Sequence, residues 1–342
     1  MKNIITSSIL FASASLAFGA FDASTGIADG NSIITGEQTI TTKLTVTNGS
    51  LLSVGTASTK GVLNVEYGGD PIKNSGTIVV AEKSDLVVKN TAAKGWSTAY
   101  ENVGNIDVYG SAVFNTSKPG EAYVKISNST VNVYAGGNLK SNSILWIEKN
   151  GLIHLQNSAQ ADFSDMYIAQ GTLKIDDNIQ FGTYYQKRII ASGTGYIATV
   201  DASDAKSVSL YEFVYTNSHF DIKLSQDLFS IAKLTKTKGS DNDLILTDFR
   251  NDTFQIRDNS NLVINGETFT LSYNNTTSVV NLYAADIDGN IITLAEDQYW
   301  YFTDDGFLNI ANFGNVAVPE PAQWAVIFGA LALGLAIYRK RK

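Results

Sequence analysis

The sequence predicts an all-β fold, a right-handed parallel β-helix, from three observations. The chain of 342 residues is rich in Gly, Asn, Ser and Thr and has only four prolines, a composition that favours short strands joined by many turns. A short motif recurs along the chain, with Asn at a turn before a run of branched apolar residues. Within each copy the apolar residues alternate with polar ones, which is the period of a half-buried strand.

The recurring motif defines the repeat. Successive copies begin 26, 28, 26, 22 and 20 residues apart, at Asn48, Asn74, Asn102, Asn128, Asn150 and Gln170. Because Asn tolerates a left-handed backbone, we expect these residues at tight turns. Most copies hold a second apolar run, such as residues 85–88 or 112–114. One coil of this length cannot bury its own apolar side chains, but stacked coils share a continuous core.

We therefore assign residues 21–249 to the β-helix, with its clear repeats starting near residue 30. The rhythm resembles that of the passenger-type and polymorphic-outer-membrane-type β-helices of secreted bacterial proteins. The spacing is irregular, and a β-sandwich array is the alternative fold.

Residues 250–313 have a different pattern. Three turn dipeptides each separate two strand-like runs, at Asn265-Gly266, Asp288-Gly289 and Asp305-Gly306. Such dipeptides are typical of two-residue β-hairpin turns. We expect a small antiparallel meander that covers the last coil, whose edge would otherwise be exposed.

The first 20 residues have the layout of a secretory signal peptide. Lys2 is followed by an apolar run over residues 4–18, and Ala17 and Gly19 form a small-x-small cleavage pattern. We expect the mature chain to begin near Ala20 or Phe21, outside the cytoplasm.

Residues 314–342 form a tail unlike the rest of the chain. Residues 324–338 carry no charge and would form a helix of about 22 Å, short for a bilayer core of about 30 Å. Trp324 and Tyr338 would lie at the two membrane interfaces. The four cations that follow would stay on the cytoplasmic side and stop transfer, namely Arg339, Lys340, Arg341 and Lys342.

The segment before the apolar run cannot continue a helix. Pro319 and Pro321 fix their own φ and push Val318 and Glu320 towards extended conformations. The order of V-P-E-P, a short apolar helix and a basic terminus resembles the PEP-CTERM sorting signal. The resemblance covers about 25 residues, with Pro319, Glu320 and Pro321 as the motif triplet.

The PEP-CTERM resemblance implies export, retention at the inner membrane and removal of the tail. In that family the partner is an exosortase, a membrane-embedded Cys-dependent enzyme of Gram-negative bacteria that make exopolysaccharide. The processed protein would then reach the cell surface or the extracellular space. The signal is attached to many unrelated proteins, so it implies nothing about the function of the remaining chain. A plain C-terminal membrane anchor is the alternative.

Composition excludes several kinds of chemistry. The chain has no cysteine, which removes disulfides, thiolate metal sites and a Cys nucleophile. Between the two ends it keeps 20 basic and 32 acidic residues, a net charge of −12. A nucleic-acid partner needs a basic footprint, so we expect none.

Few residues are candidates for catalysis. His154 alternates with apolar neighbours and faces outwards, and His219 has no acidic or Ser-rich motif beside it. The cluster of Asp176-Asp177 with Lys187-Arg188 and the Asp286-Asp288 segment are read as charged turns. We expect no enzyme activity, no cofactor and no metal.

Three tyrosines are the candidates for ligand contact. Tyr109, Tyr134 and Tyr167 are expected in corresponding parts of successive coils, where a stripe of rings would stack on exopolysaccharide. Covering of a solvated sheet is the alternative role for these side chains.

The sequence thus predicts an exported, non-enzymatic protein of the bacterial cell surface or extracellular matrix, structural or adhesive in function. Two other functions stay open, a polysaccharide-binding module and a polysaccharide lyase or hydrolase on a β-helix.

Overall fold

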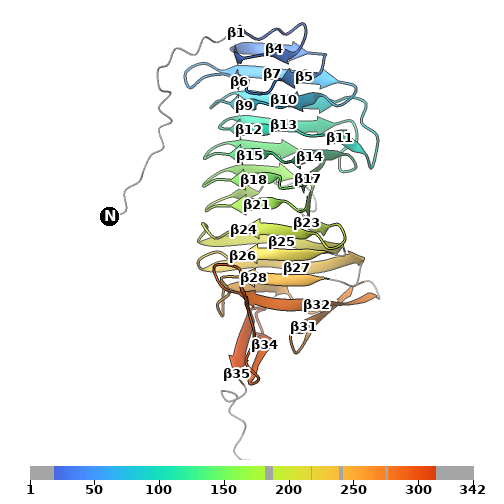
Figure 1. The fold of residues 1–342 in the computed structure, drawn as a ribbon, viewed down its shortest axis with the longest axis vertical. Helices are drawn as coiled ribbons and strands as arrows, with labels where there is room; N and C mark the ends of the chain where they lie inside the picture. The colour runs from blue at the N-terminus through green and yellow to red at the C-terminus, as the bar shows by residue number, and fades with distance from the viewer. Residues whose placement is uncertain (1–18, 182–187, 217, 239–241, 274–275, 313–342) are drawn as a thin grey trace, which may run out of the picture.

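A computed structural model describes residues 19–181, 188–216, 218–238, 242–273 and 276–312. These residues form an all-β structure without a helix, a parallel β-solenoid of about nine turns. The coils stack along the long axis of the molecule, with the N-terminal coils at the top of Figure 1. The predicted solenoid is confirmed and the β-sandwich alternative is wrong.

One long sheet, sheet A, runs the length of the solenoid. All six repeat copies contribute their apolar run to it, and the pairing between successive coils is parallel. Its parallel strands are β1 (Gly19–Ala20), β3 (Asn31–Ile34), β6 (Leu51–Val54), β9 (Thr77–Val80), β12 (Asn105–Val108), β15 (Thr130–Val133), β18 (Leu152–Leu155), β21 (Thr172–Ile175), β24 (Ile197–Asp201), β26 (His219–Lys223), β28 (Asp243–Thr247) and β32 (Thr276–Ala285).

Three further sheets complete the coils. The second apolar run of each copy lies in sheet C, and the strand before the repeat turn lies in sheet B or sheet D. Sheet B comprises β2 (Ile27–Ala28), β5 (Leu44–Val46) and β8 (Ile72–Asn74). Sheet C comprises β4 (Gly36–Ile40), β7 (Gly61–Tyr67), β10 (Asp85–Asn90), β13 (Ser111–Thr116), β16 (Asn138–Ser141), β19 (Gln160–Phe163) and β22 (Gln180–Phe181). Sheet D comprises β11 (Thr98–Tyr100), β14 (Tyr123–Ser127), β17 (Ile144–Glu148), β20 (Asp165–Ala169), β23 (Arg188–Ser192), β25 (Ser207–Thr216), β27 (Leu228–Lys238) and β29 (Phe254–Asp258).

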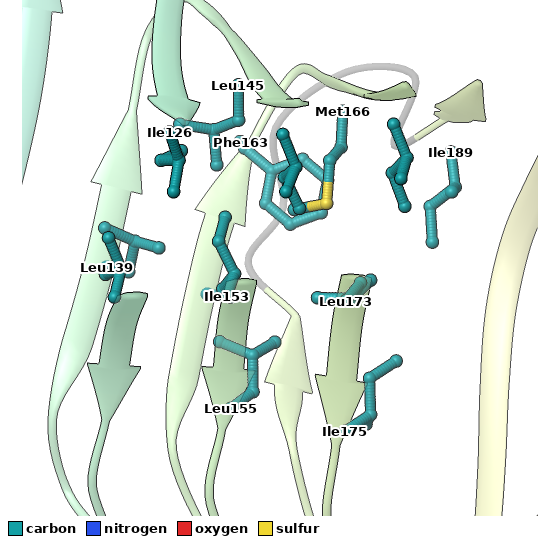
Figure 2. Close-up of a cluster of buried hydrophobic side chains, with 14 of the residues drawn as sticks. Ile126, Leu139, Leu145, Ile153, Leu155, Phe163, Met166, Leu173, Ile175 and Ile189 are labelled. Carbon is teal, nitrogen blue, oxygen red and sulfur yellow. The ribbon is translucent and has the colours of Figure 1, made fainter. Parts of the chain in front are cut away.

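The core is a set of apolar columns that run along the solenoid axis. Ile106, Val131, Ile153 and Leu173 are register partners on successive strands of sheet A, and each is almost fully buried. Figure 2 shows side chains from sheets A, C and D pointing towards one another in this interior. Full burial of one such aliphatic side chain contributes about 1.5–3 kcal/mol, so shared columns stabilise coils that could not fold alone.

The repeat asparagines have two different roles. Asn128, Asn150 and Gln170 have positive φ, as expected for a tight turn. Asn74 does not, and its side-chain amide instead donates to the carbonyls of Val103 (3.1 Å) and Asn105 (2.8 Å) in the next coil. The expectation of one left-handed turn at every copy is therefore only partly right.

In the copies that begin at Asn48 and Asn102, a glycine takes the left-handed position instead, at Gly49 and Gly104. Gly104 has φ +69°, and a Cβ there would lie 2.3 Å from the carbonyl oxygen of Asn74. Only glycine allows this close approach between two coils.

Parallel pairing continues beyond residue 249, the predicted end of the β-helix. β29 pairs in parallel with β27, and β32 pairs in parallel with β28. The sequence pattern did not predict this parallel pairing, because a hairpin signal marks a local turn and does not show which distant strand a segment pairs with.

Antiparallel pairs form around all three turn dipeptides. Sheet A ends with β30 (Leu262–Asn265) and β31 (Thr268–Tyr273) beside β32, and β33 (Ile291–Ile292) also pairs with β32. A separate hairpin joins β34 (Gln298–Phe302) to β35 (Leu308–Asn312). The role of these strands as a cap stays a prediction, as does the right-handed winding.

The predicted start of the mature chain, near Ala20 or Phe21, falls at strand β1. Gly19 and Ala20 form β1, which pairs with β3, and Phe21 is buried. The rest of the predicted signal peptide lies outside the described residues.

The predicted sorting tail also lies outside the described residues, with Val318, Pro319, Glu320, Pro321, Trp324, Tyr338 and the four terminal cations. No helix of the described part of the chain is long and apolar enough to span a membrane.

Candidate functional site

The three predicted contact tyrosines do not form one stripe. Tyr109 and Tyr134 follow β12 and β15 of sheet A, and their rings stack with centroids 4.1 Å apart and planes 7° apart. Tyr167 lies in β20 of sheet D. The expected correspondence is wrong for Tyr167, because each coil holds several strands and this residue comes just before a repeat turn rather than after it.

Tyr167 belongs instead to an aromatic cluster on the outer face of sheet D. Its ring stacks on Trp146 of β17, with centroids 5.6 Å apart and planes 25° apart. Tyr123 of β14 meets Trp146 edge to face at 4.9 Å. We call Tyr123, Trp146 and Tyr167 the sheet D aromatic cluster. All three side chains are partly exposed, so the cluster gives this face an apolar surface beside solvent.

Partial burial raises the pKa of the phenols in both aromatic groups further above physiological pH. Partial burial raises the pKa of Tyr123 and of Tyr167, and the nearby Asp165 carboxylate raises that of Tyr167 further. Burial and the hydrogen bond with Tyr134 raise the pKa of Tyr109. These rings therefore act as uncharged contact surfaces at physiological pH.

Charged side chains alternate along the same sheet. Asp165, Arg188, Glu212 and Lys233 occupy register positions on four successive strands of sheet D. Arg188 binds Asp165 through two hydrogen bonds, from Nε at 2.9 Å and from Nη2 at 2.6 Å. Lys233 Nζ lies 3.4 Å from Glu212 Oε2. We call this row the sheet D charge ladder. It gives each of two almost completely buried acidic residues, Asp165 and Glu212, a basic partner.

The acidic and basic residues that are close in sequence near residues 176–188 have different partners in the structure. Arg188 binds Asp165, whereas Asp176 lies 3.0 Å from His154 Nε2 and Asp177 accepts a hydrogen bond from the backbone N–H of Lys206. No combined acid and base site is formed by Asp176, Asp177 and Arg188, and Lys187 lies outside the described residues.

Both histidines have a carboxylate partner. His154 faces outwards as predicted. His219 Nδ1 lies 2.8 Å from Asp243 Oδ2 at an ion-pair distance, without the alignment of a hydrogen bond. The pair of His219 and Asp243 could not be seen in the sequence, because the two residues lie in successive coils. Ser218, beside His219, is buried and donates its hydroxyl to the Ala191 carbonyl, so it is not placed as a nucleophile for that histidine.

The Asp286 segment is a turn. The Asp286 carboxylate accepts hydrogen bonds from the Asn290 side-chain amide and from the backbone N–H groups of Asn290 and Asp288, and these hydrogen bonds hold its pKa below the usual value. Gly289 supplies a φ of +85°. Within the described ranges, no group of three or more His, Cys, Asp and Glu residues is placed to hold a metal ion.

A polar cleft lies at the corner where the chain leaves sheet D for sheet A. Its volume is about 420 Å³, and its walls are mainly amide, hydroxyl and charged groups from four successive coils. Lys125 of β14 and Glu148 of β17 line it, with Nζ and Oε1 3.6 Å apart. Lys125 Nζ also lies 5.7 Å from the ring centroid of Trp146. The cleft therefore borders the aromatic cluster.

Sequence analysis named Tyr167 as a contact residue but did not place Lys125 and Trp146 beside it, although the repeat held a usable signal. Lys125, Trp146 and Tyr167 come three, four and three residues before the repeat residues Asn128, Asn150 and Gln170. Each also lies between two buried apolar residues. Alignment of the segments before the repeat turn would have placed all three on one face.

No family model, curated protein or solved structure matches the chain. Its function is therefore inferred from its own residues.

Proposed function

We propose that the chain is an exported structural or adhesive protein of the bacterial cell surface or extracellular matrix, sorted by an exosortase. One observation carries the proposal. The tail has, in this order, the residues V-P-E-P, a run of 15 uncharged residues after Gln323, and four terminal cations. The apolar run would act as a short membrane helix that holds the chain at the inner membrane until the tail is removed.

The solenoid supports a structural role. Stacked coils with one continuous core give a long, regular outer surface, and such surfaces suit many weak contacts. In this proposal the coils wind in the right-handed sense, and the antiparallel strands after β29 cover the last coil. The protein would not be an enzyme, consistent with the separate pairing of its two histidines.

Substitution of the motif triplet tests the sorting step. The variant carries Pro319→Ala, Glu320→Gln and Pro321→Ala, which remove the extended segment and its carboxylate without touching the solenoid. We expect the variant to stay in the membrane fraction with its tail intact, while the unchanged protein loses the tail. Fractionation of the producing cells and C-terminal peptide mass mapping measure both.

The matched control is Pro119→Ala, which removes an exposed proline from a turn of the solenoid. The control should be processed like the unchanged protein. Normal loss of the tail from the triple variant would contradict the proposal.

A further inference from the structure

The cleft beside the sheet D aromatic cluster has the make-up of a sugar-binding site. Its four charged side chains balance, with the carboxylates of Glu101 and Glu148 and the ammonium groups of Lys125 and Lys149. The remaining lining is mainly Asn and Ser side chains and turn backbone. Neutral polar ligands with many hydroxyl groups fit such a lining, because amides and carboxylates both bind hydroxyls by directed hydrogen bonds.

Cross-coil hydrogen bonds fix the shape of the cleft. The Asn102 amide donates to the Ser127 carbonyl at 2.8 Å, and its oxygen accepts from the Gly104 N–H at 3.1 Å and the Ser129 hydroxyl at 3.0 Å. Because the bonds to Ser127 and Ser129 join neighbouring coils, the walls do not have to be ordered when a ligand binds.

Other polar groups of the cleft remain available. The Glu101 carboxylate and the Asn128 side-chain amide make no hydrogen bond within the described part of the chain, and both residues are exposed. They can therefore bind a ligand without breaking a contact of the fold.

The aromatic cluster extends the cleft with an apolar surface. Trp146 and Glu148 are two residues apart in β17 and face the same side of sheet D. A sugar ring has an apolar C–H face and a polar rim, so it can lie against an aromatic side chain while its hydroxyls bind neighbouring polar groups.

The charge of the cleft favours neutral glycans over polyanionic ones. The cleft has no excess of cations, and the chain as a whole has a net charge of −8. A polyanionic glycan would be repelled at long range and would find no net positive site. We propose that this cleft and the sheet D aromatic cluster bind a segment of neutral polysaccharide. The inference rests on the proposed function, because export is what would bring the surface into contact with such polymers.

Affinity electrophoresis of the exported protein from its producing cells tests the site. Native gels contain hydroxyethylcellulose, laminarin or galactomannan as neutral probes, and polygalacturonate as the acidic probe. We expect retardation by at least one neutral probe and none by polygalacturonate. Trp146→Ala should weaken binding at least about tenfold.

A second variant guards against loss of folding. Glu101→Ala with Asn128→Gly changes only exposed groups, and Gly accepts the φ of +47° at position 128, so this variant should fold normally and bind several-fold more weakly. The matched control is Tyr134→Ala, which removes an aromatic ring from the other stack and should leave binding unchanged.

Three results would overturn the inference: no retardation by any of the three neutral probes, retardation by polygalacturonate alone, or a loss of binding in Tyr134→Ala that the two cleft variants do not show. The C-terminal mass and location of the same preparation are recorded separately. A correctly processed surface protein that binds none of the neutral probes would refute the sugar site and leave the sorting proposal standing.

Discussion

At the scale of single residues, two acidic residues on the outer face of sheet A have pKa values shifted in opposite directions. Burial raises the pKa of Asp221 above its usual 3.8, and the hydrogen bond from Thr247 offsets this only in part. Burial also acts on Asp201, but hydrogen bonds from Ser203 and the ion pair with Lys223 outweigh it and hold that pKa low. The ionised form therefore weakens the fold at Asp221 and strengthens it at Asp201.

We predict that Asp221→Asn stabilises the protein at pH 7. The folded state favours the protonated form of Asp221. The protonated side chain therefore adds to the stability of the fold at acid pH, and this contribution is lost as the pH rises through the raised pKa. Asn keeps an oxygen that can accept the Thr247 hydroxyl. The thermal midpoint of the variant should exceed that of the unchanged protein at pH 7, and the difference should disappear below about pH 3.8.

Asp201→Asn is the matched control and should have the opposite sign at pH 7. Its destabilisation should fade as the pH falls through the lowered pKa of Asp201. Midpoints that move in the same direction for both variants would contradict this account of the two carboxylates.

At the scale of elements, the sheet D charge ladder ties successive coils together. The carboxylates of Asp165 and Glu212 are only 8% and 6% exposed, and each has a basic partner on the next strand. Removing one partner of a nearly buried pair leaves a charge that neither water nor the protein compensates, which typically costs 3–5 kcal/mol.

We therefore predict that Arg188→Met lowers the free energy of unfolding by about 3 kcal/mol. Lys89→Met is the control, because Lys89 and Glu66 are both about half exposed and lie 3.7 Å apart; such pairs contribute less than about 1 kcal/mol. Urea unfolding followed by circular dichroism measures both. Equal losses for the two variants would show that the ladder does not stabilise the stack.

The sequence predicts the strands of the solenoid better than the contacts between its coils. The strands of sheet A follow from local alternation after each repeat turn, because a period of two is visible within four residues. The partners Asp165 and Arg188, or His219 and Asp243, lie 23 and 24 residues apart, and their contact depends on the length of each coil. Irregular coil lengths hide such contacts, and the sheet D aromatic cluster was missed for the same reason.

At the scale of the whole molecule, the solenoid presents a long surface, and we propose that the tail directs this surface to the outside of the cell. The continuous core explains how short coils with little apolar content each can form one stable unit. The sorting role of the tail stays a prediction from sequence alone, which is possible because proline, charge and apolar length act locally and need no tertiary context.

The most direct test of the central claim is intact mass and C-terminal peptide mapping of the protein from the cells that produce it, with its location recorded. We predict that surface or secreted material lacks everything after about residue 321. An intact terminus with Arg339 to Lys342 in all of the protein would contradict it.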